Sequence, residues 1–393
     1  MARLVASGAT SISTDSINLS SLLYGAITVA NSSFISVNYG GGAATEFYGS
    51  FSYDASGRNI TGGTLNAVRE LGYGSLLYTL DGMSVSAPVF IGWVNSGQTA
   101  TARATILAGS DTLYGSDYGD TLRAYAGDDT IYGAGGNDLL DGGTGVNLID
   151  GGAGTDTVAR SAYRSSSTVV SYADHVYVGD AGGYDKLANV EYIRFTDQTV
   201  STSAAPAFDP LSYLAANTDI AAALGVNPGA ALHHYLTAGG RERRSTAFNV
   251  DGYLASNPDL AAAFGTNTTA ATQHYITAGR LEGRNTSFNV MSYIAANPDL
   301  ISAFGTNTTA AALHYATAGR LEGRSSTFNT AAYLSRNPDV QRALGTSELA
   351  AATHYVTNGY REGRSAAPLA STSTRSAMGL EPAQQSATLA AGW

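Results

Sequence analysis

The chain contains no cysteine, few charged residues and no long apolar run. Of its 393 residues, none is Cys and 13% are charged, which excludes disulfides, thiol catalysis and cysteine-ligated zinc. No stretch approaches the roughly 18–20 apolar residues of a membrane span, and residues 1–20 lack the apolar core of a signal peptide. H-E-x-x-H and G-x-S-x-G motifs are also missing from the sequence. We therefore expect neither a membrane span nor a typical hydrolase.

Glycine and aspartate are abundant, and the aspartate is unevenly distributed. The chain has 46 Gly and a net charge of −10, a composition that favours tight turns or repeats over a helical enzyme core. Residues 106–159 contain nine Asp and one Arg, whereas acids and Arg balance over 201–364. Such a concentrated negative charge needs a cation, and it is a poor surface for nucleic acid.

Six consecutive nine-residue units occupy residues 106–159. They read ILAGSDTLY, GSDYGDTLR, AYAGDDTIY, GAGGNDLLD, GGTGVNLID and GGAGTDTVA. The sixth position is Asp or Asn throughout: Asp111, Asp120, Asp129, Asp138, Asn147 and Asp156. The eighth is always aliphatic: Leu113, Leu122, Ile131, Leu140, Ile149 and Val158. A flexible linker has no reason to keep an aliphatic residue at every ninth position, so we expect a folded repeat.

The nine-residue period predicts a parallel β-roll. Glycines permit a sharp turn, the residues around the aliphatic position form a short strand, and repetition winds the chain into a solenoid. Successive turns alternate sides, so that like loops stack every 18 residues. Carboxylates stacked about 4.8 Å apart repel by about 0.9 kcal/mol even in water. A cation held by carboxylate and carbonyl oxygens would reverse this repulsion, and such ligands favour Ca²⁺.

The units resemble the G-G-x-G-x-D-x-U-x nonapeptide of RTX proteins, the hemolysin-type calcium-binding repeats. Residues 151–159 match at every position, whereas the first two units lack several glycines and Tyr118 replaces one of them. We expect roughly two to four Ca²⁺ ions. The resemblance implies these calcium-binding residues: Asp111, Asp120, Asp129, Gly133, Gly136, Asp138, Gly142, Gly145, Asn147, Gly151, Gly154 and Asp156.

The segments beside the repeats read as β structure. Residues 185–200 resemble the strands that close RTX rolls, and residues 46–85 alternate apolar and polar residues like an antiparallel meander. Residues 86–97 predict a short helix with Ser86 as N-cap and Gly97 after its end. We expect Phe90 and Trp93 in the core, and the whole N-terminal region as a cap on the roll.

A second repeat of 40 residues runs four times from residue 208 to 364. Its invariant columns include Phe208, Phe248, Phe288, Phe328; Tyr213, Tyr253, Tyr293, Tyr333; His234, His274, His314, His354; and Arg244, Arg284, Arg324, Arg364. In one unit, Asn257 as N-cap, Pro258 at the first position and Gly265 after the end predict a helix. Residues 268–279 predict another, which begins with threonine caps and stops at Gly279.

The histidines and the Glu-x-Arg pairs of this repeat have structural explanations. One histidine per unit is too far from the next for the imidazoles to share a metal ion, so we expect packing or capping roles. We interpret the Glu-x-Arg pairs as salt bridges between repeats or as caps on carbonyl groups, each worth about 0–1 kcal/mol.

The sequence therefore predicts a multidomain chain. Residues 1–105 form a β-rich cap with short helices, 106–200 the calcium-binding roll with closing strands and 201–207 a linker. Residues 208–364 form four α-helical repeats, and 365–393 a disordered tail that is compatible with a secretion signal. RTX resemblance implies export by type I machinery, so that the roll folds on calcium outside the cell. We expect a secreted, non-enzymatic protein with a structural or adhesive role at the cell surface or in the matrix, through self-association or through glycan or protein contacts. The alternatives are an enzyme-associated module, a cryptic hydrolase and a soluble binding protein that uses the helical repeats.

Overall fold

A computed structural model describes residues 1–8 and 10–367. The chain divides into two compact units. The first comprises Met1–Phe248 and Thr272–Glu282, and the second comprises Asn249–Ala271 and the described residues from Gly283 onward. Most of the expected disordered tail and secretion signal lies outside the described residues. Within those residues, no helix has the length and apolar character to cross a bilayer.

The first unit begins with an antiparallel sheet. Its strands are β1 (Arg3–Ala6), β2 (Ala26–Ala30), β3 (Phe34–Gly40), β4 (Ala43–Tyr53), β5 (Ile60–Gly72) and β6 (Ser75–Asp81), in the order β1-β6-β5-β4-β3-β2, and β7 (Val85–Ser86) pairs with β5. The 3₁₀ helices η1 (Thr14–Ser16) and η2 (Leu19–Tyr24) and the helices α1 (Ala87–Asn95) and α2 (Thr99–Ile106) complete this part. The expected meander and the helix after Ser86 are both present. Phe90 is buried and Trp93 packs against the core.

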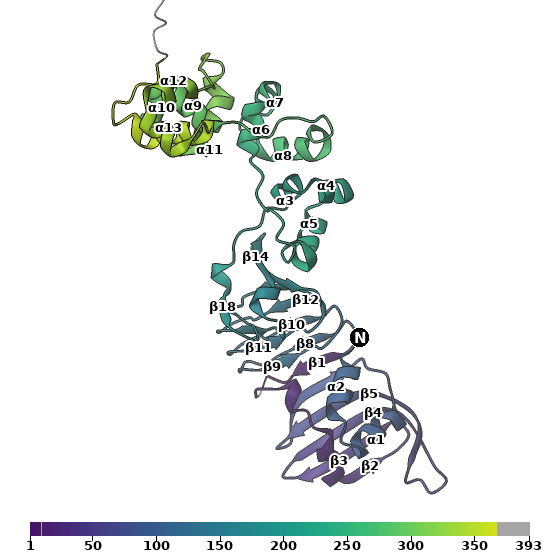
Figure 1. Ribbon diagram of the computed structural model, residues 1–393. Helices are drawn as coiled ribbons and strands as arrows, with labels where there is room; N and C mark the ends of the chain where they lie inside the picture. The colour runs from purple at the N-terminus through teal and green to yellow at the C-terminus, as the bar shows by residue number, and fades with distance from the viewer. Residues whose placement is uncertain (9, 368–393) are drawn as a thin grey trace, which may run out of the picture. The chain divides into compact units, whose positions relative to one another are not determined.

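The nine-residue units form a roll of two parallel sheets (Figure 1). Their strands are β8 (Thr112–Tyr114), β9 (Thr121–Arg123), β10 (Thr130–Tyr132), β11 (Leu139–Asp141), β12 (Gly145–Asp150) and β13 (Thr157–Ala159). Strand β10 lies between β8 and β12 in one sheet, and β11 lies between β9 and β13 in the other. Paired residues are 18 apart, as with Leu113 and Ile131, and all six eighth-position aliphatics have no exposed surface. The predicted winding is therefore present.

Further strands extend the roll at both ends. Strand β1 pairs in parallel with β8 and antiparallel with β6, so that one continuous sheet joins the N-terminal part to the roll. At the other end, β16 (Gly183–Ala188) follows β12, and β17 (Tyr192–Arg194) follows β13. Strands β14 (Thr168–Tyr172), β15 (His175–Asp180) and β18 (Thr199–Ser201) and the 3₁₀ helices η3 (Arg164–Ser166) and η4 (Thr202–Ala204) complete this end. The sequence predicted the closing strands but not β1.

Each 40-residue repeat consists of three seven-residue helices and a π-helical turn. The first helices are α3 (Pro210–Ala216), α6 (Val250–Ser256), α9 (Val290–Ala296) and α12 (Thr330–Arg336), and the second are α4 (Thr218–Leu224), α7 (Pro258–Phe264), α10 (Pro298–Phe304) and α13 (Pro338–Leu344). The third are α5 (Pro228–His234), α8 (Thr268–His274), α11 (Thr308–His314) and α14 (Glu348–His354). The π-helical turns are η5 (Tyr235–Gly239), η6 (Tyr275–Gly279), η7 (Tyr315–Gly319) and η8 (Tyr355–Gly359).

The helix boundaries agree with the sequence, but two caps differ. Pro258 begins α7 and Gly265, with a φ of 56°, ends it. The Asn257 side chain forms no cap; its amide donates instead to the carbonyl oxygens of Tyr253 and Asn285, at 2.7 Å each. The third helix is capped by Asn267, whose Oδ1 accepts from the Ala270 N–H at 3.0 Å. The prediction of threonine caps was wrong because the side chain of Asn267, one residue before Thr268, accepts the Ala270 N–H.

The repeated tyrosines and histidines are structural, whereas the arginine pairs differ from expectation. The hydroxyl of Tyr213, which has no exposed surface, lies 2.7 Å from His234 Nδ1, and two later repeats contain the same pair. Arg244 binds Glu242 at 2.5 Å and Asp219 at 2.8 Å, both within its own repeat. The prediction of salt bridges between repeats was therefore wrong, because the chain returns after the π-helical turn to the start of its own second helix.

Candidate metal centre

The sixth-position side chains stack into two ladders along the edges of the roll. The first ladder contains Asp111, Asp129 and Asn147, and the second contains Asp120, Asp138 and Asp156. Each step is a hydrogen bond in which a side-chain oxygen accepts the backbone N–H found 18 residues earlier. The distances are 2.7 Å from Asp111 N to Asp129 Oδ1, 3.0 Å from Asp129 N to Asn147 Oδ1, 2.7 Å from Asp120 N to Asp138 Oδ1 and 2.8 Å from Asp138 N to Asp156 Oδ1. The predicted grouping into two edges is present.

Four of these carboxylates have a second oxygen that is buried and accepts no hydrogen bond from any described residue. These are the Oδ2 atoms of Asp111, Asp129, Asp138 and Asp156. All four residues are at most 3% exposed. A buried ionised oxygen without a donor is costly, and ordinary folded proteins leave few such atoms. The arrangement therefore calls for a cation or for protonation.

Burial raises the pKa of these carboxyl groups. It raises the pKa of Asp129 to about 7, with a further contribution from the charges of Asp111, Asp128 and Asp185. It raises that of Asp138 to about 7 as well, and the charges of Asp156 and Asp120 add to the effect. The pKa values of Asp111 and Asp156 are also raised, mainly by burial. The backbone N–H bonds act in the opposite direction but do not cancel burial.

Glycine residues lie directly against the orphaned oxygens. A Cβ added to Gly133 would meet both Asp138 Oδ2 and the carbonyl oxygen of Gly151. A Cβ added to Gly151 would lie 2.5 Å from Asp156 Oδ2. The first glycine of these units therefore packs directly against carboxylate and carbonyl oxygens. Any side chain at these positions would collide with these oxygens and displace them.

This donor set fits a hard cation. All the donors are oxygens, from carboxylates and loop carbonyls, which are the ligands Ca²⁺ takes. Among the described residues, no three His, Cys, Asp or Glu side chains gather into a metal-binding cluster. A cation here would therefore rely on backbone carbonyl oxygens as well as on carboxylates, and a zinc or other nitrogen- and sulfur-ligated site is not indicated.

Two ladder positions differ from the other four. Both oxygens of Asp120 accept hydrogen bonds: Oδ1 from Ile12 N at 2.5 Å and Ser116 Oγ at 3.1 Å, and Oδ2 from Ser116 N at 2.5 Å. Asn147 is neutral, and its amide donates to Asp185 Oδ1 at 2.8 Å. These two positions are satisfied without a cation.

Sequence reasoning missed the groups that end the ladders. Asp185 continues the first ladder, and Arg160 binds it at 2.8 Å and Asp180 at 2.7 Å. Glu191 continues the second ladder and accepts from Asp156 N at 2.7 Å. At the opposite end, the Ala2 N–H donates to Asp111 Oδ1. The nine-residue pattern does not reach any of these residues, so the pattern alone gave no signal for them.

The comparison with protein families identifies these units. Residues 107–140 and 133–159 match the family model described as the RTX calcium-binding nonapeptide repeat, in four copies. Residues 107–159 are RTX calcium-binding repeats. Such repeats bind Ca²⁺, in agreement with the donor set of the two ladders.

Other comparisons add little to this. A solved structure with similarity to the chain is that of the extracellular lipase LipA from Serratia marcescens, at 24% sequence identity and a TM-score of 0.17. The alignment covers 22% of this chain and 13% of the lipase, so the chain spans a small part of the lipase's length. No curated protein matches the chain.

Proposed function

We propose that the protein is a secreted RTX protein whose roll folds when it binds calcium outside the cell. The observation that carries this proposal is the set of four buried carboxylate oxygens, on Asp111, Asp129, Asp138 and Asp156, which accept no hydrogen bond from the described residues. Without a cation, the stacked charges oppose folding of the roll. With one, the binding free energy becomes folding free energy.

The cellular calcium gradient would make this coupling directional. Extracellular calcium modules work with dissociation constants of about 10⁻⁴–10⁻³ M, and cytosolic calcium is far below that range. The roll would then stay unfolded during passage through a type I export channel and fold after release. The absence of cysteine fits a chain that crosses the envelope unfolded, because its folding needs no disulfide chemistry.

We assign the calcium ligands to the two ladders and their loops. The carboxylates with a free oxygen are the main ligands, and the carbonyl groups of the loop glycines complete the sites. Asp120 and Asn147 belong to the same ladders but have satisfied side chains, so we expect them to contribute less. The loop glycines assigned to the sites are Gly133, Gly136, Gly142, Gly145, Gly151 and Gly154.

The rest of the chain supports a structural or adhesive role. We propose that residues 1–105 cap the roll, that 106–200 form the roll with its closing strands, that 201–207 are a linker and that 208–364 present a helical surface. Repeated helical units make extended surfaces for contacts with proteins or glycans. The polar groups that recur in these units bond within each unit, since Tyr213 binds His234 and Arg244 binds Asp219. We therefore propose a non-enzymatic protein of the cell surface or matrix.

Titration calorimetry of the full chain with Ca²⁺ tests the calcium assignment. We expect roughly two to four ions per chain and much weaker heats with Mg²⁺, which demands a rigid octahedral site. Absence of saturable Ca²⁺ binding would refute the assignment. Static light scattering tests the surface role separately: calcium-dependent oligomers support assembly, and a strict monomer with and without Ca²⁺ contradicts self-association while leaving the calcium sites intact.

A further inference from the structure

The N-terminal sheet contains an apolar cavity that the calcium sites do not use. The cavity measures about 410 Å³ and lies between α1, η2 and strands β2 to β5. Its walls include Val37, Phe51, Leu65 and Phe90. Ligand pockets have volumes of about 300–1,000 Å³ and mainly apolar walls, so this cavity has the size and lining of a small-molecule site.

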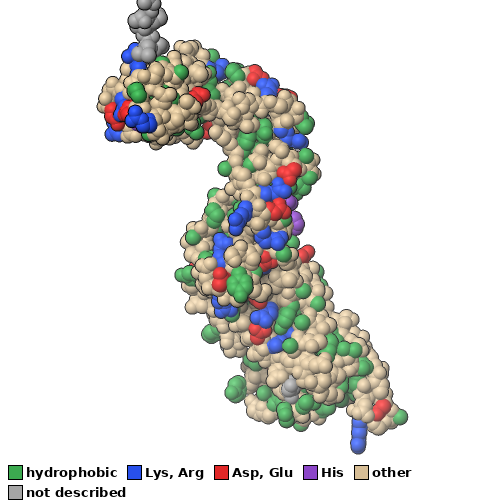
Figure 2. All heavy atoms as spheres, in the orientation of Figure 1, with side chains coloured by type: hydrophobic (Ala, Val, Ile, Leu, Met, Phe, Trp, Pro, Cys, Tyr) green, Lys and Arg blue, Asp and Glu red, His purple; other side chains and the backbone are tan. Residues whose placement is uncertain are grey.

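Apolar side chains at the cavity mouth are exposed. Leu23 is 52% and Ile27 67% exposed, and both line the cavity. Figure 2 shows hydrophobic side chains scattered over the visible surface, including the N-terminal part of the chain. Exposed apolar groups around an apolar cavity mark a binding site more strongly than scattered ones do. The occupant should therefore be apolar over most of its length.

One cationic group stands at the same cavity. Arg58 lines it from the loop between β4 and β5, and its guanidinium forms no ion pair with any described residue. The acid in this loop, Asp54, is engaged by other groups: it accepts from the N–H and hydroxyl of Ser56 and from the side chain of Asn59. Arg58 is therefore available to an anionic group of a ligand.

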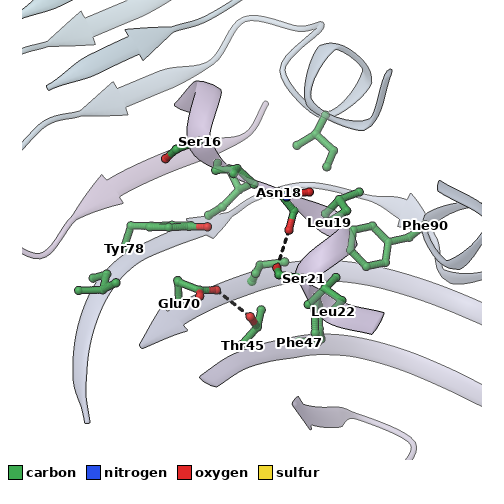
Figure 3. A pocket seen from close by; sticks show the side chains of 15 residues that line it. Ser16, Asn18, Leu19, Ser21, Leu22, Thr45, Phe47, Glu70, Tyr78 and Phe90 are labelled. Atoms are coloured by element: carbon green, nitrogen blue, oxygen red, sulfur yellow. Dashed lines mark hydrogen bonds between the residues drawn. The ribbon is translucent and has the colours of Figure 1, made fainter. Parts of the chain in front are cut away.

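The neighbouring cavity has a different character. It measures about 370 Å³ and shares Leu22, Phe47 and Phe90 with the first. One end of it is polar, because Thr45 donates to Glu70 at 2.7 Å (Figure 3), and burial raises the pKa of Glu70. No Lys or Arg among the described residues lines this second cavity, whereas Arg58 lines the first. This places the head of an anionic ligand at the Arg58 cavity.

We propose that this cavity binds a medium-chain fatty acid, with the alkyl chain among the apolar walls and the carboxylate at Arg58. The alternative occupant is a β-strand of another protein paired with the edge strand β2. Such a strand would cover the mouth of the cavity without filling it, whereas the alkyl chain of a fatty acid can enter. The proposal concerns the N-terminal sheet and is independent of the calcium function.

Titration of the full chain with decanoate tests the proposal, at a calcium concentration low enough to keep the calcium soap dissolved. We expect saturable binding of one decanoate, with affinity rising about fourfold for each methylene from octanoate to decanoate. Arg58→Gln should weaken decanoate binding by up to about fivefold and leave binding of the uncharged decanol unchanged. Arg69→Gln, which removes a cation of β5 outside the cavity, should change neither.

A second pair of variants tests the location. Ala30 is exposed on β2 and lines the cavity, whereas Thr28 is exposed on the same strand and does not. Ala30→Phe should abolish binding of both decanoate and decanol, and Thr28→Phe should leave it intact. The proposal is overturned if decanoate binding does not saturate, or if Ala30→Phe and Thr28→Phe have the same effect on it. It is also overturned if decanoate does not bind and light scattering shows a dimer that Ala30→Phe disrupts.

Discussion

Replacing Asp138 by asparagine should have opposite effects with and without calcium. The substitution keeps the shape of the side chain, so that Oδ1 can still accept from Asp120 N at 2.7 Å. It removes the negative charge from a buried oxygen that accepts no hydrogen bond from the described residues. The amide group that replaces it is neutral, as the side chain of Asn147 is in the first ladder.

The magnitude follows from the pKa of this carboxyl. Burial raises the pKa of Asp138 from 3.8 to about 7, and each pKa unit corresponds to 1.36 kcal/mol, so ionisation costs at most about 4 kcal/mol in the calcium-free roll. Relaxation and water reduce this to about 1–3 kcal/mol. Because the folded pKa is raised, the calcium-free roll loses stability as the pH rises from about 4 to about 7, and Asp138→Asn should therefore stabilise it most at pH 8.

The assay is circular dichroism of the full chain at pH 8 in EGTA, urea unfolding at pH 8 in millimolar Ca²⁺, and calcium titration. In EGTA, where the unsubstituted roll should be unfolded, Asp138→Asn should shift the folding equilibrium toward the folded roll by about 1–3 kcal/mol, seen as a gain of β signal. In the titration, loss of a ligand should weaken calcium binding at that site by at least about tenfold. Asp120→Asn is the matched control, because both oxygens of Asp120 already accept hydrogen bonds, and it should not stabilise the calcium-free roll. If Asp138→Asn destabilises the roll in Ca²⁺ but gives no gain of β signal in EGTA, the proposed cost of the buried charge is wrong.

Three further predictions follow from single contacts. Arg160→Met should destabilise the roll by about 3–5 kcal/mol, measured by urea unfolding in calcium, because it leaves the fully buried Asp185 without its ion-pair partner; an unchanged midpoint would contradict this. Tyr293→Phe should cost about 0.5–1.5 kcal/mol in thermal unfolding of the helical repeats, since it removes the 2.7 Å bond to His314, and a neutral effect would show that packing alone matters there. The Arg324 partner lowers the pKa of Asp299, so the repeats should lose stability as the pH falls below about 4, and Asp299→Asn should reduce that loss in a pH series of melting curves.

The nine-residue period was sufficient to predict how the roll winds. A strand has one side chain pointing inward at its centre, so the invariant aliphatic column fixed which residues are buried, and Leu113 and Ile131 do pair 18 residues apart. The same logic grouped Asp111 with Asp129 and Asp138 with Asp156. These features depend only on local repetition, which a single sequence displays in full.

Contacts between distant segments could not be predicted in this way. Strand β1 lies against β8 although more than a hundred residues separate them, and no repeat links the two segments. The positions of Arg160 and Glu191 at the ends of the ladders could not be predicted for the same reason. In the helical repeats, the sequence shows an arginine at the position of Arg244 in every unit. Whether this arginine pairs within its unit or with the next depends on the turn after the π-helix, which the spacing of the repeated residues does not specify.

Hydrogen exchange of the full chain, measured by mass spectrometry with and without calcium, shows directly whether calcium folds the roll. Amides of residues 107–159 should be protected in millimolar Ca²⁺ and exchange rapidly in EGTA at pH 8, while the helical repeats keep their protection in both conditions. Equal protection of residues 107–159 in the two conditions would contradict the claim that calcium folds the roll.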